Sequence, residues 1–162
     1  MKARRGLCAA LSLLGFCATV WGQQSNGYVF FAPGGVTVGS HTSMMLHAGV
    51  GGEGILGKGL GVGAEIGALG PKEDFSCAVG VFSANGYYHF IHGRDRKADP
   101  FVTGGYTLVF RSDTANLFNF GGGVNYWFSR RLGLRAEVRD QVWRNCCGTA
   151  HYWGVRLGLA FR

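Results

Sequence analysis

The chain has 162 residues, enough for one domain, and its 16 basic and 9 acidic residues give a net charge of +7. The basic residues are scattered and form no stripe that could follow a phosphate backbone, so nucleic acid is not an expected partner. Glycine is the compositional outlier, with 29 residues where ordinary usage is about 7%. Only 3 prolines accompany the glycines, which excludes collagen and a disordered linker.

The first 22 residues have the pattern of an export signal. Lys2, Arg4 and Arg5 give a positive start, residues 6–21 carry no charge, and small or compact residues precede the polar run from Gln23. An uncleaved anchor is the alternative, but the apolar run is shorter than the ~20 residues that a membrane-spanning helix needs. The pattern predicts a cleaved signal peptide over 1–22 and a mature domain over 23–162.

The mature chain alternates with a period of two, which is typical of β-strands, and no segment shows a helical period. The last segment is the most regular: Trp153, Val155 and Leu157 share one face, while glycines and Arg156 lie on the other. The first segment is apolar on both sides, so its orientation stays open. An even number of strands joined by short connections closes an antiparallel barrel. The eight expected strands are 27–38, 43–53, 58–69, 77–90, 100–111, 117–128, 132–143 and 151–162.

The two faces of these strands distinguish two kinds of barrel. A soluble lipocalin-like barrel is apolar inside and polar outside, whereas a membrane barrel has its apolar residues outside. In residues 59–67 the face opposite the large residues holds Glu65 and otherwise only glycine. Small side chains suit the interior of a narrow barrel, and the large residues then face lipid. The sequence predicts an all-β fold, an eight-stranded antiparallel up-and-down transmembrane β-barrel, with a soluble periplasmic barrel that binds a hydrophobic ligand as the alternative.

Aromatic residues are spaced as in the two girdles of a membrane barrel. Phe118 and Phe128 lie ten residues apart on one expected strand, about 33 Å at ~3.3 Å per residue. A tilt of ~40° reduces this to about 25 Å, the height of the apolar band of such barrels. With both termini on the periplasmic side, the inner girdle is Tyr88, Phe90, Tyr126, Phe128 and Phe161, and the outer girdle is Phe110, Phe118, Phe120 and Trp153.

Several charged residues fall on the inward face, where charges must be paired. Eight strands leave an interior only wide enough for side chains, so the pattern favours a lumen that is plugged by a charge network over an ion-selective pore. The expected network consists of His47, Glu53, Glu65, Arg135, Glu137, Arg139 and Arg156.

Motifs for catalysis or cofactors are weak. Residues 49–54 fit GxGxxG and residues 52–58 approach a phosphate-binding loop, but a strand pattern follows where a helix is needed, so neither nucleotide nor another cofactor is expected. No HExxH or GxSxG is present, and no cysteine pair has metal-ligand spacing. His151, Ser112 and Asp140 are the loose candidates for the alternative of a lipid-modifying barrel enzyme. The bridge state of Cys77, Cys146 and Cys147 stays open.

The stretch GGGVNYWFSRRLGLRAEVRD (121–140) and the closing GVRLGLAFR resemble the last strands of the small OmpA-like outer-membrane barrels. The resemblance implies a monomeric protein of the bacterial outer membrane, surrounded by lipid, with a structural, envelope-stability or surface-interaction role and no catalysis. It also implies recognition by the barrel-assembly machinery, which reads a terminal aromatic residue. Phe161, followed by Arg162, is the expected assembly signal.

Overall fold

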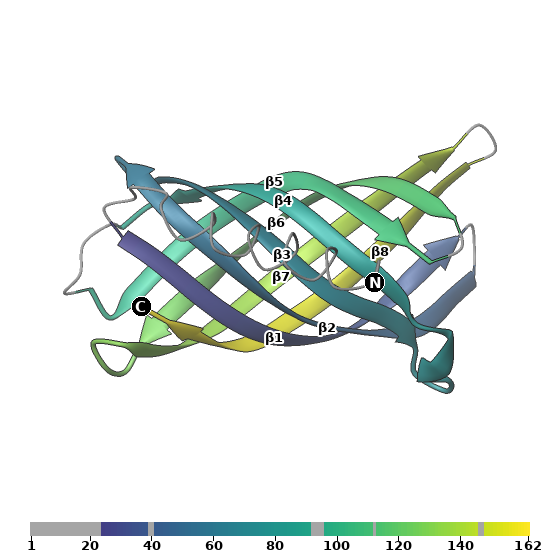
Figure 1. Cartoon of the computed structure of the whole chain (residues 1–162), viewed down its shortest axis with the longest axis horizontal. Helices are drawn as coiled ribbons and strands as arrows, with labels where there is room; N and C mark the ends of the chain where they lie inside the picture. The colour runs from purple at the N-terminus through teal and green to yellow at the C-terminus, as the bar shows by residue number, and fades with distance from the viewer. Residues whose placement is uncertain (1–23, 39–40, 92–95, 112, 146–147) are drawn as a thin grey trace, which may run out of the picture.

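The alternation of apolar and small residues forms eight strands that close into one barrel (Figure 1). The structure is a computed structural model that describes residues 24–162 except 39–40, 92–95, 112 and 146–147. Each strand pairs antiparallel with its neighbour in the chain, and β1 pairs with β8, so the predicted fold class is confirmed. The strands are β1 (Gln24–Val38), β2 (His41–Gly57), β3 (Leu60–Pro71), β4 (Val79–His89), β5 (Ala98–Phe110), β6 (Thr114–Trp127), β7 (Leu132–Asn145) and β8 (Gly148–Phe161).

One end of the barrel, here called the terminal end, carries the start of β1 and the end of β8 (Figure 1). It also carries the β2–β3 turn, in which Gly57 pairs with Leu60 across the two residues Lys58 and Gly59. Both turn residues have positive φ, 50° and 82°, which is the geometry of a tight two-residue hairpin. The sequence that approaches a phosphate-binding loop is therefore a strand end and a hairpin turn, and strand β3 follows it.

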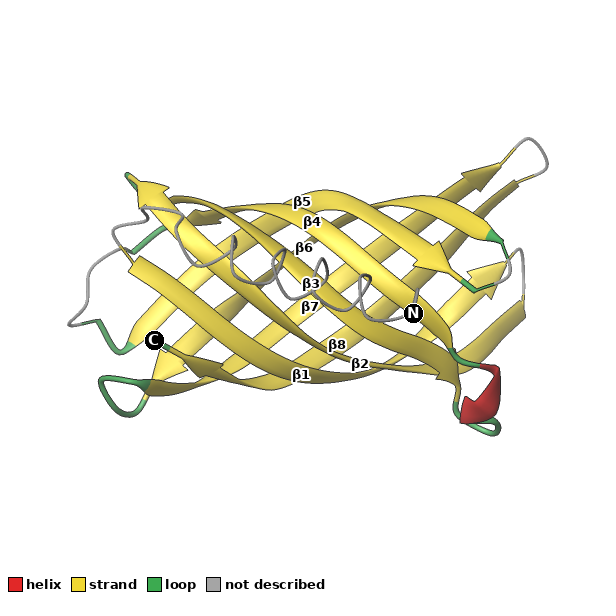
Figure 2. Ribbon diagram, in the orientation of Figure 1, coloured by secondary structure: helices red, strands yellow, loops and turns green. Residues whose placement is uncertain are grey.

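The other end, here called the opposite end, holds the short 3₁₀ helix η2 (Phe75–Cys77), shown red in Figure 2. The side-chain hydroxyl and the backbone N–H of Ser76 donate to Asp74, and these hydrogen bonds lower the pKa of its carboxyl below the usual value. This turn corrects the expected strand 77–90, which begins only at Val79. Strands β6 and β8 begin earlier than expected, so the connections that precede these two strands are very short.

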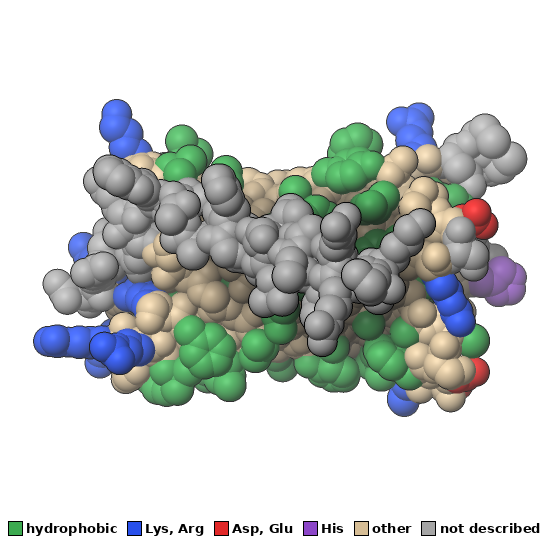
Figure 3. Space-filling view, viewed as in Figure 1, with side chains coloured by type: hydrophobic (Ala, Val, Ile, Leu, Met, Phe, Trp, Pro, Cys, Tyr) green, Lys and Arg blue, Asp and Glu red, His purple; other side chains and the backbone are tan. Residues whose placement is uncertain are grey.

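The outward face of the barrel is apolar along its length. Figure 3 shows hydrophobic side chains over the wall and charged side chains gathered at the two ends. Phe118 is 70% exposed and Val138 is 58% exposed, and such outward residues occur on every strand. Among the described residues, no helix is long and apolar enough to cross a bilayer.

The inward face is mainly polar from the middle of the barrel to the terminal end, and it is apolar near the opposite end. An apolar cluster at the terminal end contains Tyr28, Phe30, Ala32, Trp127 and Ala160. A second cluster at the opposite end contains Leu69, Val81 and Tyr152. Charged and amide side chains fill the space between the clusters and continue to the terminal end, where Asn26, His89 and Asp99 lie near the ends of their strands.

Gly51 on β2 faces this interior at a place where a side chain does not fit. A Cβ atom there would lie 2.6 Å from Cζ of Tyr28, whereas a Cβ atom on the neighbouring outward Gly52 would meet nothing closer than 3.6 Å. We expect Gly51→Ala to lower the free energy of unfolding by about 1–3 kcal/mol because of overpacking. Urea unfolding of the refolded protein in lipid measures this change. Gly52→Ala is the matched control, and equal stability of the two variants would contradict the prediction.

Candidate functional site in the barrel lumen

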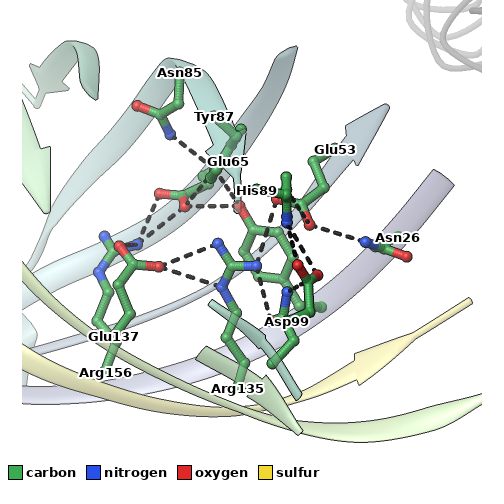
Figure 4. A network of polar contacts seen from close by, with 12 residues as sticks. Asn26, Glu53, Glu65, Asn85, Tyr87, His89, Asp99, Arg135, Glu137 and Arg156 are labelled. Carbon is green, nitrogen blue, oxygen red and sulfur yellow. Dashed lines mark hydrogen bonds and ion pairs between the residues drawn. The ribbon is translucent and has the colours of Figure 1, made fainter. Parts of the chain in front are cut away.

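Glu65 on β3 is the centre of a buried charge network in the lumen (Figure 4). Its carboxylate accepts from Arg139 at 2.8 Å and from Arg156 at 2.9 Å. The hydroxyl of Tyr28 on β1 donates to the same carboxylate at 2.7 Å. Two arginines from β7 and β8 therefore meet one glutamate from the far wall of the barrel.

Glu137 on β7 binds the arginines that flank it on the same face of the strand. The guanidinium of Arg135 lies 3.2 Å from one carboxylate oxygen, and Nε of Arg139 donates to the other. Arg156 approaches the carboxylate at 3.9 Å. The spacing of two residues between these side chains follows from the strand itself, which points every second residue inward.

Arg135 extends the network toward the terminal end. It lies 3.4 Å from the carboxylate of Glu53, which also accepts from Asn26 at 3.0 Å. Its guanidinium stacks over the rings of Tyr28 and Phe101, at 4.2 and 4.1 Å from their centroids. The ring contacts add cation–π attraction in a place that water does not reach.

All seven residues of the expected network face the lumen, and none is more than 4% exposed. Six of them, three glutamates and three arginines, are joined by ion pairs. His47 joins through Nδ1, which lies 3.3 Å from the Arg156 guanidinium. Since the formal charges of the six cancel, the network satisfies the requirement that buried ions be paired.

Several further lumen residues join this network beyond the seven predicted from the sequence. His89 on β4 binds Asp99 on β5 at 2.9 Å and lies 3.7 Å from Glu53. His89 lies at an inward position of its expected strand, and this position could have predicted it as a member of the network. Tyr28 was not identifiable, because the first strand is apolar on both faces. Amide and hydroxyl groups complete the lumen: Asn85, Asn119, Asn125, Ser83 and Thr107.

The charged groups of this site are engaged with one another. Its acids and bases hold each other in ion pairs, and the cations are covered by aromatic rings. Arg156, for example, lies 4.2 Å above the ring of Phe30. Within the part of the chain that the structure describes, no three His, Cys, Asp or Glu side chains come together as a metal site would require.

The nine aromatic residues of the expected girdles all point outward, each at least 38% exposed. Tyr88 and Phe90 pack edge to face at 5.2 Å near the terminal end. Phe120 and Trp153 flank Asp140 on the neighbouring strands toward the opposite end. The aromatic side chains therefore lie on the wall that carries the other exposed apolar residues.

Two of the three loose enzyme candidates meet on this wall. Nδ1 of His151 lies 2.9 Å from Oδ2 of Asp140, which gives the outward carboxylate of Asp140 a partner. Ser112 lies outside the described residues, so no nucleophile is placed beside the pair. Cys77 is exposed and forms no disulfide with another described residue, and its thiol donates to the Asp74 carboxylate at 3.6 Å. Cys146 and Cys147 lie outside the described residues.

Comparison with solved structures identifies the class of protein to which this fold belongs. The N-terminal β-barrel domain of Pseudomonas aeruginosa OprF is 18% identical, with a TM-score of 0.60 over 85% of this chain and 98% of that one. Neisserial surface protein A is 10% identical, with a TM-score of 0.66 over 85% of this chain and 96% of that one. A de novo designed transmembrane β-barrel is 15% identical, with a TM-score of 0.52 over 84% and 93%.

The chain has the fold of the small eight-stranded outer-membrane barrels. At these identities the likeness concerns the fold alone. Neither a protein-family model nor a curated protein sequence matches the chain.

Proposed function

We propose that this protein is an integral outer-membrane barrel with a plugged lumen and a structural, envelope-stability or surface-interaction role, without catalysis. The single observation that carries the proposal is the charge network around Glu65, which joins β2, β3, β7 and β8 across the lumen. An eight-stranded barrel has an interior just wide enough for side chains. Ion pairs that connect strands across that space support a closed lumen and a rigid barrel.

The outward wall supports the membrane location. Large exposed apolar residues on all eight strands need a hydrocarbon environment, and the charged residues at both ends suit headgroups and water. In this proposal the terminal end faces the periplasm, the signal peptide over 1–22 is removed on export, and the barrel is a monomer surrounded by outer-membrane lipid.

The plug predicts that the purified protein does not conduct ions. In planar bilayers we expect no sustained conductance steps from the wild-type chain. A charge-neutral double variant, Glu65→Ser with Arg156→Ser, removes two long side chains from the centre of the lumen and is expected to leak. Single-channel recording measures both proteins.

Each protein used in these recordings must be folded. Folding is demonstrated when the unboiled sample migrates faster than the boiled sample on a detergent gel. Sustained nanosiemens steps from the wild type would contradict the plug. Recovery of the protein from the soluble periplasm, with no heat-dependent shift, would instead favour the soluble ligand-binding barrel.

Phe161 is proposed as the signal read by the barrel-assembly machinery. Its side chain is 43% exposed and points outward at the end of β8, where no lumen contact depends on it. We expect Phe161→Ala to lower the amount of assembled barrel in the outer membrane several-fold in cells and to leave refolding of the purified protein unchanged. Val155→Ala, an outward residue of the same strand that is 42% exposed, is the control. An equal loss in both variants would refute a specific signal.

A further inference from the structure

The opposite end of the lumen holds an open cavity of about 190 Å³. Inward residues of several strands line it, and we call this space the vestibule. The lining is mainly apolar, and the principal side chains are Val36, Leu69, Val109, Leu117, Trp143 and Tyr152. Leu117 and Leu69 are each 7% exposed, whereas Trp143 at the rim is 40% exposed.

The vestibule differs in character from the rest of the lumen. Toward the terminal end the same inward positions carry paired charges and amides, but here Val79, Val81 and Val109 pack around Leu69 and Tyr152. In the proposed orientation this mouth opens toward the aqueous exterior. Apolar surface in a concave opening is unfavourable in water, and apolar concave surfaces are characteristic of small-molecule sites.

Tyr152 separates the vestibule from the charge network. Its hydroxyl donates to the backbone oxygen of Ala32 on β1 at 3.4 Å, which holds the ring across the lumen. The His47 ring lies beneath, with its centroid 6.2 Å from that of Tyr152, and Arg156 follows. A molecule that enters the vestibule therefore meets a floor, so the geometry is that of a binding site and not of a channel.

We propose that the vestibule binds a small uncharged apolar molecule from the external medium, of the size of one aromatic ring or an indole. The size follows from the volume, because an apolar protein cavity of about 150 Å³ accommodates benzene. The absence of charge in the ligand follows from the lining, which holds no Lys, Arg, Asp or Glu side chain to pair with a buried ion and whose polar members besides Tyr152 are Gln141 and His151. This site goes beyond the proposed structural role and does not depend on whether the lumen conducts.

Fluorobenzene observed by ¹⁹F NMR is a direct probe of this site. The full mature chain is refolded into lipid nanodiscs, and empty nanodiscs measure partition of the probe into lipid. We expect saturable one-to-one binding above that background, with displacement by unlabelled indole. Binding that does not exceed empty nanodiscs would overturn the proposal.

Two substitutions on β5 locate the site. Val109→Phe fills the vestibule and is expected to weaken binding at least tenfold, while Val102→Phe adds the same ring to the outward face, where Val102 is 44% exposed. Val102→Phe is expected to bind as the wild type does. Heat-dependent gel migration verifies folding of each variant, and Ala115→Leu replaces Val109→Phe if that barrel does not fold. Unchanged binding in the folded filled variant would also overturn the proposal.

Discussion

Replacing Glu65 with glutamine is expected to lower the free energy of unfolding by about 3–5 kcal/mol. The substitution keeps the shape of the side chain but removes a carboxylate charge that pairs with both Arg139 and Arg156. Both arginines are at most 3% exposed, so water cannot replace the lost carboxylate. The large effect comes from leaving one buried positive charge in excess, because Glu53 and Glu137 cannot balance three arginines, and not from the loss of one hydrogen bond.

Urea unfolding of the refolded barrel in lipid tests this expectation. Glu73→Gln is the matched control, because Glu73 is exposed in the turn that precedes η2. We expect Glu73→Gln to have the same free energy of unfolding as the wild type. A second test adds Arg156→Met to Glu65→Gln: the double variant removes one cation with the anion and should recover part of the lost stability. If Glu65→Gln were as stable as Glu73→Gln, the ion pairs would not hold the lumen together.

The strand number, the barrel closure and the inward and outward faces of seven strands were predictable from the sequence. The reason is that a strand in a narrow barrel has two different surroundings, and a period of two separates them cleanly. Residues 58–69 illustrate this, since the glycine face of the segment is the lumen face of β3. Glycine fits where another strand or ring lies close, as Gly51 does beside Tyr28.

The orientation of the first strand was not predictable. Tyr28 and Phe30 face the lumen while Val29 and Phe31 face outward, so all four are apolar or aromatic and the alternation carries no signal. The structure explains the inward rings by tertiary contacts. Arg135 stacks on Tyr28, and Arg156 stacks on Phe30, although these partners lie more than a hundred residues away in the chain. The alternation of residues within one strand cannot indicate a contact between side chains so far apart in the sequence.

The membership of the charge network was also only partly predictable. Charges on inward positions indicate burial, and burial requires partners, but parity does not say which strands face each other across the lumen. The expected network did not include His89 and Asp99. The closed register brings His89 to within 3.7 Å of Glu53 from β2. Strand ends shifted by a few residues for a related reason: turn chemistry, not apolar alternation, decides where pairing stops.

Arg135→Met is expected to be about as destabilising as Glu65→Gln, by about 3–5 kcal/mol. Methionine fills much of the same volume but leaves the buried carboxylates of Glu53 and Glu137 without their shared cation. Arg135→Lys should be intermediate. Lysine keeps the charge, but it has no planar group to lie on the rings of Tyr28 and Phe101 while donating to two carboxylates.

The same unfolding assay ranks these variants against Arg130→Met, which changes an exposed arginine in the turn between β6 and β7. The expected order of stability is wild type equal to Arg130→Met, then Arg135→Lys, then Arg135→Met. The lysine variant separates two contributions, since charge alone would make it equal to the wild type. If Arg135→Lys were as unstable as Arg135→Met, the flat shape of the guanidinium and its ring contacts, rather than its charge, would dominate at this end of the lumen.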